Sequence, residues 1–241
     1  MFSELYVSGI KIKDIEEEAY YKRLPVVKNI VDRDMLEFSS RVTFLVGENG
    51  IGKSTLIEAM AVAMGFNPEG GTRNFNFSTS DSHSGLFNYM TICRGIKKPR
   101  DGFFLRAESM YNAATYLDSM GPEATLCYGG SLHRQSHGES FLSVVENRFG
   151  GHGIYILDEP EAALSPTRLL RLLCDIKELV EKDSQFIIAT HSPILMAFPG
   201  ADVLQLSDNG IEHISYKDTE HYIVTKRFMD APEKMIAELF D

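Results

Sequence analysis

The residues best suited to chemistry are Gly47–Ser54, whose sequence GENGIGKS has the spacing G-x-x-x-x-G-K-S. A strand-like run precedes them and good helix formers follow, which is the setting of a phosphate-binding loop. Gly50 and Gly52 let backbone N–H groups surround a β-phosphate, and the following helix points its positive end at the same anion. Lys53 is expected to bridge the β- and γ-phosphates, and the Ser54 hydroxyl to bind Mg²⁺. The predicted nucleotide contacts are Gly47, Glu48, Asn49, Gly50, Ile51, Gly52, Lys53, Ser54 and Thr55. A chance glycine-rich turn is the alternative.

Two adjacent carboxylates follow a second apolar run, in the segment GIYILDEP. The strand delivers Asp158 and Glu159 to the carboxyl end of a sheet, where ligands bind in open α/β folds. Asp158 is expected to hold Mg²⁺ through water, and Glu159 to orient or deprotonate an attacking water. Adjacent acids at a strand end are often simply solvated, and the preceding phosphate-binding loop is what favours a chemical role.

Two further segments carry weaker signals. FIIATHSP places His191 at the end of another apolar strand, where a neutral imidazole could bond to a γ-phosphate or to Glu159; a satisfied structural histidine is the alternative. QSHGES begins a predicted helix, so Ser136 and Gly138 offer a hydroxyl and an open N–H at a helix N-terminus, a second phosphate-binding device. An ordinary N-cap, with Glu139 favouring the positive helix end, explains the same residues.

The order of these motifs resembles the ABC ATPase superfamily, with GENGIGKS as Walker A, QSHGES as the signature, ILDEP as Walker B and His191 as the switch histidine. The resemblance implies an α/β fold of the P-loop NTPase type, with a mainly parallel core sheet, an antiparallel β part and an inserted helical lobe. It also implies ATP and Mg²⁺ as ligands, ATP hydrolysis, and a head-to-tail homodimer around two nucleotides. In such a dimer Ser136, Gly138 and Glu139 of one protomer meet the γ-phosphate held by Lys53 of the other.

Within that superfamily the chain is similar to small stand-alone ATPases related to the heads of Rad50 and SMC proteins, on fragments such as SHGESFL, LDEPEAALSP and ATHSPILMA. His137 and Glu139 depart from the usual LSGGQ signature, Ser165 stands where many ABC proteins have Asp, and no Q-loop glutamine is evident. Glu108, after the strand FFLRA, is a candidate metal or water contact or an ordinary surface acid. These departures disfavour a transporter subunit.

Two functions remain in competition. One is an ATP-driven motor or switch, with DNA repair, chromosome maintenance or defence as settings allowed by analogy. The other is a nucleotide-gated binding module with little turnover that recruits a protein or DNA. The formal charge of -10 argues against a broadly basic nucleic-acid surface but leaves room for a local basic patch.

The remaining sequence indicates what positions these motifs. We expect a single domain over 1–241, with a loop and inserted lobe over about 66–150 that carries the signature. Strands are predicted at 2–12, 41–46, 91–96, 103–107, 154–157, 186–189 and 202–206, and helices after Ser54 and at 109–120, 166–182, 220–229 and 232–240. The helix over 218–229 is expected to pack against the domain rather than present a docking face. The loop from Asn67 to Gly85, with Arg73, could cover the nucleotide, form an interface or simply be mobile.

Cysteine usage and hydropathy bear on the compartment. Three cysteines without a CxxC pair predict neither a disulfide framework nor a zinc site. Charges break up the first twenty residues, and no apolar run approaches membrane-spanning length. We therefore expect a cytoplasmic protein with no direct membrane insertion.

Overall fold

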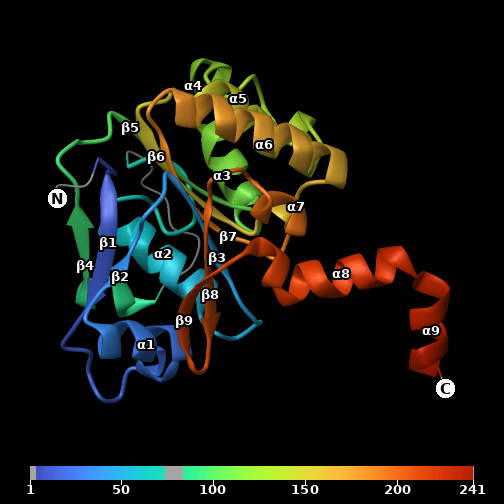
Figure 1. Ribbon diagram of the computed structural model, residues 1–241. Helices are drawn as coiled ribbons and strands as arrows, with labels where there is room; N and C mark the ends of the chain where they lie inside the picture. Colours follow the sequence, from blue (N-terminus) through green and yellow to red (C-terminus); the bar gives the residue numbers. More distant parts are fainter. Residues whose placement is uncertain (1–3, 74–83, 241) are drawn as a thin grey trace.

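The computed structural model describes residues 4–73 and 84–240, and its centre is a six-stranded sheet in the order β5-β6-β7-β3-β8-β9 (Figure 1). The strands are β3 (Val42–Val46), β5 (Asp101–Arg106), β6 (Gly153–Asp158), β7 (Gln185–Ala189), β8 (Asp202–Ser207) and β9 (Gly210–Ile214). All neighbours pair in parallel except β9, which returns antiparallel to β8 through a tight turn. The carboxyl ends of five strands therefore meet along one edge.

A smaller antiparallel sheet lies beside it, in the order β2-β1-β4. Its strands are β1 (Val7–Ile12), β2 (Leu36–Glu37) and β4 (Met90–Arg94). Together with the large sheet and the helices, it gives the predicted fold: a mainly parallel core sheet, an antiparallel β part and a helical lobe. That prediction is confirmed.

The large sheet is covered by helices on both faces, as expected for strands in which nearly every residue is buried. The helices are α1 (Pro25–Arg33), α2 (Lys53–Ala63), α3 (Met110–Ser119), α4 (Pro122–Leu126), α5 (His137–Arg148), α6 (Pro166–Glu181) and α7 (Pro193–Met196). Leu45 and Ile156 pack with α1 and α2 on one face. Their neighbours Phe44 and Leu157 pack with α3, α5, α6 and α7 on the other. Consecutive strand residues point to opposite faces, so α2 and α5 lie on opposite sides of the sheet.

Helix α6 shows how the sequence pattern forms one of these layers. It begins at Pro166, after Ser165 at the N-cap. Leu169, Leu172, Ile176 and Leu179 recur at helical spacing and are all buried, as predicted.

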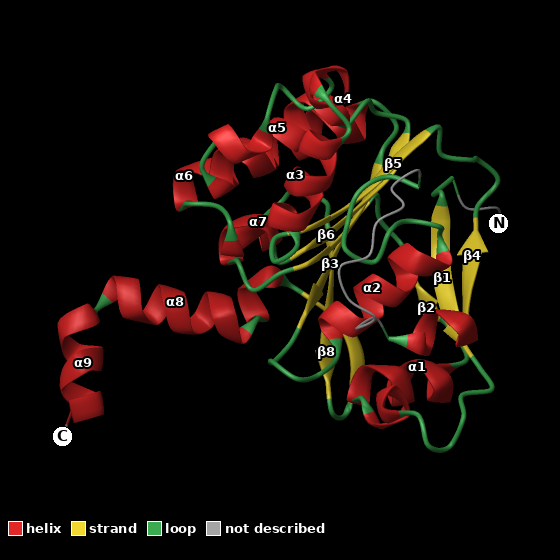
Figure 2. Cartoon of the chain, turned by 180° about the vertical axis from the view of Figure 1, so that it is seen from behind, coloured by secondary structure: helices red, strands yellow, loops and turns green. Residues whose placement is uncertain are grey.

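The helical lobe is narrower than the sequence indicated. It consists of α3, α4 and α5 with a short 3-10 helix at Leu132–Arg134, and it lies above the sheet in Figures 1 and 2. The segments 91–96 and 103–107, which we expected to belong to the lobe, supply β4 and β5 of the two sheets. The remaining 3-10 helices are Tyr20–Arg23, Gly85–Tyr89, Pro160–Ala162 and Tyr216–Asp218.

The C-terminal arm, α8 (Glu220–Asp230) and α9 (Pro232–Phe240), projects away from the domain (Figures 1 and 2). No described residue of either helix is buried, and Ile223, Phe228 and Phe240 are all exposed. The prediction that this helix packs against the domain was wrong: only the first turn of α8 approaches the body, next to α7. Among the described residues, no helix is long and apolar enough to span a membrane.

Candidate functional site

The loop between β3 and α2 is shaped by glycines with left-handed backbone. Gly50 has a φ of 85°, and no atom lies within 4 Å of the place where its Cβ would be. Gly52 has a φ of 102°, and a Cβ there would lie 2.8 Å from Val26 of α1. These positions require glycine for different reasons: the first keeps an open concave backbone, and the second allows α1 to pack closely. A cradle of this kind can receive a phosphate group.

Lys53 is buried behind this loop, with 4% of its surface exposed. Its ammonium donates to the carbonyls of Gly47, at 2.7 Å, and Glu48, at 2.9 Å. Burial lowers the pKa of Lys53, opposed by the charges of Glu159, Asp158 and Glu161. The amine is therefore held in place at the first turn of α2, with three carboxylates nearby.

Asp158 ends β6 and meets Ser54 of the loop. The Ser54 hydroxyl donates to Asp158 Oδ1 at 3.2 Å, which joins two residues 104 positions apart in the chain. Burial raises the pKa of Asp158 to about 6, although the charge of Arg106 acts in the opposite direction. The two predicted Mg²⁺ ligands are thus side by side.

Arg106 is a site residue that the sequence alone did not assign. Its Nε lies 3.2 Å from Asp158 Oδ2, and its Nη1 donates to Glu58 Oε2 at 2.8 Å. The cause is register, because β5 pairs with β6 so that Arg106 stands opposite Asp158. Glu108, the candidate metal or water contact, is 77% exposed and lies 3.5 Å from Arg106. Arg106 therefore lies between Glu108 and Asp158 and forms an ion pair with each.

Glu159 and His191 face each other across the ends of β6 and β7. Glu159 has a φ of 48°, a left-handed conformation that is unfavourable for a residue with a side chain. His191 Nε2 lies 3.7 Å from Glu159 Oε1 and is buried without a hydrogen-bond partner among the described residues. Burial lowers the pKa of His191 to about 4, helped by Lys53 and His221. At neutral pH the imidazole is uncharged, with one nitrogen directed at the site.

Glu161 was also missed, although it lies in the motif LDEPEAAL. Its half-buried carboxylate accepts from the Thr190 hydroxyl at 2.8 Å and from the backbone N–H of His191. Burial raises its pKa, and these hydrogen bonds act in the opposite direction. Glu161 therefore fixes the backbone on which His191 stands.

In the second predicted device, at the start of α5, Ser136 and Glu139 are exposed and hydrogen-bonded within the chain, whereas Gly138 is buried. The Glu139 carboxylate accepts from the backbone N–H of Ser136 at 2.9 Å and from its hydroxyl at 2.7 Å. Arg168 of α6 donates to Glu139 at 3.1 Å and to the Ser136 hydroxyl at 3.3 Å. These bonds lower the pKa of Glu139. The N-cap described as the alternative is therefore present.

Gly138 has a structural reason to be glycine. A Cβ at this position would clash with Arg168 Nη1 and would lie 2.8 Å from the carbonyl oxygen of Ala163. The tip of α5 consequently packs directly on the segment that follows Glu159. A phosphate-binding role is not needed to explain this glycine.

Two family models match the chain. Residues 27–100 match a model described as an AAA domain, and residues 130–197 match an AAA domain with a suggested link to the AbiEii toxin of a Type IV TA system. The first match covers the loop, Lys53 and Ser54, and the second covers Ser136, Asp158, Glu159 and His191. Both motif-bearing parts of the chain are therefore similar to AAA domains.

The curated relatives of this chain are distant. Ribose import ATP-binding protein RbsA 1 of Rubrobacter xylanophilus is 26% identical over 219 residues, which is 80% of this chain and 42% of the relative. Ribose import ATP-binding protein RbsA of Corynebacterium glutamicum is 29% identical over 191 residues, which is 70% of this chain and 35% of the relative. The chain thus spans less than half the length of these relatives.

Solved structures of two kinds are similar at comparable levels. The SMC head domain from Thermotoga maritima is 16% identical, with a TM-score of 0.43 over 88% of this chain and 99% of that one. CbiO1 from Clostridium perfringens, part of an ABC transporter complex, is 18% identical, with a TM-score of 0.48 over 98% of both chains. Likeness at this level does not show whether the chain is more similar to SMC heads or to transporter subunits.

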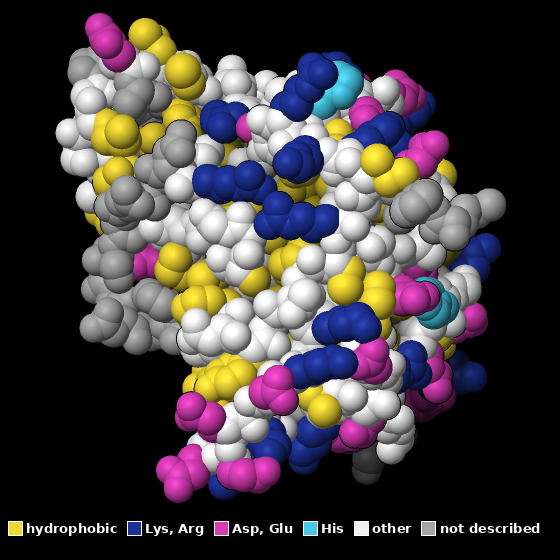
Figure 3. Space-filling view, turned by 90° about the vertical axis from the view of Figure 1, so that its left-hand side faces the viewer, with side chains coloured by type: hydrophobic (Ala, Val, Ile, Leu, Met, Phe, Trp, Pro, Cys, Tyr) yellow, Lys and Arg dark blue, Asp and Glu magenta, His cyan; other side chains and the backbone are white. Residues whose placement is uncertain are grey.

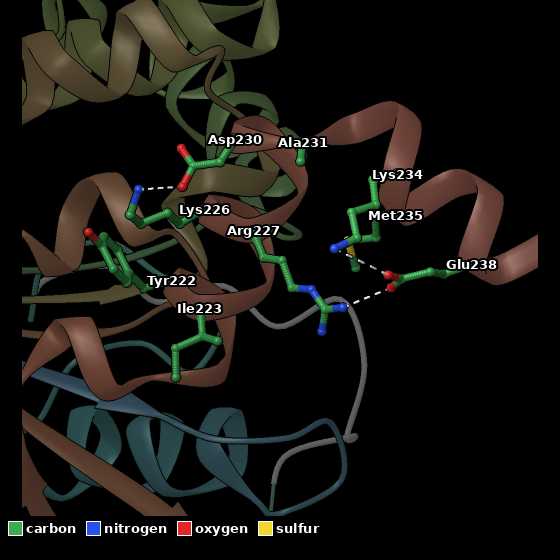
Figure 4. Close-up of a pocket in the computed structure, with 9 residues that line it drawn as sticks. All are labelled: Tyr222, Ile223, Lys226, Arg227, Asp230, Ala231, Lys234, Met235 and Glu238. Carbon is green, nitrogen blue, oxygen red and sulfur yellow. Dashed lines mark hydrogen bonds and ion pairs between the residues drawn. The ribbon is translucent and has the colours of Figure 1, made fainter.

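A hollow lies away from these motifs, in the elbow between α8 and α9 (Figure 4). It measures about 410 Å³, and its charged side chains pair with one another: Lys226 with Asp230 at 2.5 Å, and Arg227 with Glu238 at 2.8 Å. An anion-binding site would need unpaired positive side chains directed into the hollow, whereas here Lys226 and Arg227 are paired with carboxylates. This hollow is the crook of two helices, and the ATPase motifs lie elsewhere.

A basic surface lies on the side of the small sheet. Figure 3 shows Lys and Arg side chains gathered in the middle of that face. A hollow of about 210 Å³ there is lined by Arg73, Arg94, Lys97 and Lys98 among others. Lys97 pairs with Asp183 at 3.2 Å, and Arg73 lies over the Phe66 ring at 5.4 Å. Residues 74–83, the middle of the long loop that contains Arg73, lie outside the described part of the chain.

Proposed function

We propose that this domain binds ATP with Mg²⁺ and hydrolyses it as a head-to-tail homodimer, so that binding closes the dimer and hydrolysis opens it. The observation that carries the proposal is the meeting of Lys53, Ser54, Asp158, Glu159 and His191 at one sheet edge. These residues come from three separate segments of the chain. Together they provide a cation for phosphate, oxygen ligands for Mg²⁺, and a carboxylate and an imidazole for proton transfer.

The nucleotide would be held by the loop Gly47–Gly52, with Lys53 and Thr55 at the start of α2. The donor set fits a triphosphate, because the cradle is open at Gly50 and a buried ammonium lies at its base. Ser54 and Asp158 would hold Mg²⁺, which supplies charge neutralisation at the phosphates. Among the described residues, no cluster of three or more metal-ligating side chains occurs. This agrees with an ion held by two protein groups, phosphate oxygens and water.

Glu159 would orient the attacking water and accept its proton, while His191 would donate from Nε2 to the γ-phosphate or to Glu159. The left-handed backbone of Glu159 supports this assignment, because such strain collects where a side chain must be aimed at a ligand. The unpartnered Nε2 of His191 supports it as well, since a buried imidazole nitrogen without a partner is costly unless a ligand completes it.

A second copy would complete the site through Ser136, Gly138 and Glu139. The tip of α5 and the start of α2 lie on opposite faces of the large sheet, which supports contact between chains rather than within one. When a γ-phosphate arrives, the Ser136 hydroxyl would turn from Glu139 to the phosphate. Arg168 would offset the charge of Glu139 beside that phosphate.

A transporter subunit is the competing assignment within the same chemistry, since both curated relatives are named ribose import ATP-binding proteins. The shared part is the ATPase portion, less than half of either relative. We favour the switch because Arg106 and Glu108 occupy the strand end where a Q-loop glutamine is expected, and because Glu139 replaces the signature glutamine.

The decisive variant is Glu159→Gln, which keeps the shape of the side chain and removes its basicity. We expect kcat to fall by about 10²–10³ and the variant to form a stable dimer with ATP and Mg²⁺ in size-exclusion chromatography with light scattering. A variant that binds ATP but stays monomeric at every concentration would overturn the dimer.

The basic hollow on the small-sheet side favours a polyanionic partner as a second candidate function, a nucleotide-gated DNA-binding module. Arg94 and Lys98 are exposed there, on a chain whose formal charge is -10. Fluorescence anisotropy of labelled duplex DNA, with and without ATP, tests this. A salt-dependent affinity for DNA that falls in an Arg94→Glu/Lys98→Glu variant would support this function. Anisotropy that does not change when the protein is added, with or without ATP, would exclude it.

A further inference from the structure

A second histidine contacts His191 from the first turn of α8. The Nε2 atom of His221 lies 2.7 Å from Nδ1 of His191, and the ring centroids are 4.7 Å apart. Two imidazole nitrogens at this distance must share one proton, because two protons would collide and two bare lone pairs would repel. The tautomer of one ring therefore fixes the tautomer of the other.

The surroundings of His191 decide between the two arrangements. If His191 donates from Nδ1, its buried Nε2 presents a lone pair to the Glu159 carboxylate 3.7 Å away, and two acceptors face each other. If His221 donates, the His191 proton sits on Nε2 and points toward Glu159. The second arrangement is the favourable one, because it directs a partial positive charge at a carboxylate.

The backbone around His221 is well fixed although the rest of the arm is exposed. Thr219 is fully buried at the N-cap, where its hydroxyl accepts from the N–H of Tyr222 at 3.3 Å and donates to the carbonyl of Tyr216 at 2.7 Å. The rings of Tyr216 and Tyr222 also meet edge to face, with centroids 5.3 Å apart. The root of α8 thus holds His221 against His191.

We propose that His221 is a positioning residue, which donates from Nε2 to His191 Nδ1 and so keeps the His191 proton on Nε2, directed at Glu159 and the nucleotide. The structural part of this inference stands on the contact between the two rings and on the Glu159 carboxylate beside His191 Nε2. Its catalytic consequence rests on the proposed ATPase function. It connects the base of the C-terminal arm to the hydrolytic site through one hydrogen bond.

The direct test is nuclear magnetic resonance of the full chain labelled with ¹⁵N-histidine, without nucleotide. Long-range proton–nitrogen correlation shows which ring nitrogen carries the proton, and the His191 signals are assigned by their loss in His191→Gln. We expect His191 as the Nε2–H tautomer in the wild type and a loss of that preference in His221→Phe. A wild-type His191 protonated on Nδ1, or a tautomer unchanged in His221→Phe, would overturn the proposal. The wild-type spectrum decides even if the variant does not fold.

Kinetics separate positioning from simple structural support. We expect His221→Phe to lower kcat about tenfold, with the KM for ATP within about twofold, because one oriented hydrogen bond is lost. His221→Gln should recover most of the rate, since its amide can donate from a similar reach. His213→Phe removes a histidine of β9 that is bonded to Asp202 of β8; it is the matched control and should leave kcat unchanged.

The two proposals fail in different ways. If the wild type neither binds nor hydrolyses ATP while His191 is still the Nε2–H tautomer, the ATPase function fails and the histidine contact stands. If ATP is hydrolysed and His221→Phe is as active as the wild type, positioning by His221 fails alone.

Discussion

The loop before α2 and the tip of α5 are both suited to bind phosphate, but they are built to different degrees. Around the loop, Lys53 and Asp158 are buried and held by partners brought from distant segments. At the tip, Ser136 and Glu139 are exposed and bond mainly to each other. The comparison teaches that the loop side of the proposed site is preorganised within the chain. At the tip of α5 the polar groups bond to each other at the surface, and under the proposed function they would exchange these bonds for a phosphate held by a second copy.

The largest effect should come from Lys53→Ala. Loss of the buried ammonium would remove the charge proposed to face the β- and γ-phosphates, so we expect the Kd for ATP to rise by at least about 100-fold, by calorimetry. The fold should be retained, because burial already disfavours the charged amine. Lys177→Ala, on the exposed side of α6, is the control. Equal affinity in both variants would contradict a preorganised loop.

Ser136→Asp should separate the two halves. Aspartate is a good N-cap, so α5 stays formed, but it places a negative charge where the partner's γ-phosphate would arrive. We expect ATP binding to the monomer within about threefold of the wild type and hydrolysis lower by at least about tenfold. If both quantities stay at wild-type values, the tip of α5 plays no part.

Gly138→Ala tests whether the tip is rigidly packed. The new methyl group would press on the Ala163 carbonyl and on Arg168, and overpacking of this kind costs about 1–3 kcal/mol. A lower Tm by calorimetry is expected. Adding Arg168→Ala should recover only part of the loss, because the backbone carbonyl stays; full recovery would show that Arg168 alone requires the glycine.

Asp158→Asn should give the smallest effect of the four variants, and it should raise the stability of the protein rather than impair it. Burial raises the pKa of Asp158 from 3.8 to about 6, so this carboxyl favours the folded state below about pH 4, and the advantage is lost as pH rises through 6. At pH 8 the neutral amide should therefore stabilise the nucleotide-free protein by about 1–2 kcal/mol, after allowance for a weaker contact with Arg106. In thermal unfolding the gain should shrink toward pH 4. A loss of stability at pH 8 would contradict a desolvated carboxylate here.

The motif residues of the loop and of β6 could be found from the sequence because their spacing and flanking elements are local. Arg106, Glu161 and His221 could not be assigned in the same way. Arg106 reaches Asp158 only through the register of β5 on β6, and His221 reaches His191 from an arm 30 residues later. Contacts of this kind depend on strand order and helix direction, which local patterns leave open.

The same limit explains the differences in the fold. Helix α1 was not predicted because Val26, Val27 and Val31 are β-branched, which weakens the helical signal, although its apolar face is buried. Strand β5 looked like part of the lobe because the chain enters the lobe directly after it. The apolar residues of α8 predicted packing that the structure confines to its first turn.

The most direct test of the proposed composite site mixes two impaired variants, Lys53→Ala and Ser136→Asp. In a head-to-tail dimer of one copy of each, the intact Lys53 of one chain would face the intact Ser136 of the other, so one of the two sites would be complete. We expect the mixture to hydrolyse ATP faster than either variant alone, up to about a quarter of the wild-type rate, since about half of the dimers are mixed and each has one site. A mixture that hydrolyses no more ATP than its two components would contradict a site shared between two chains.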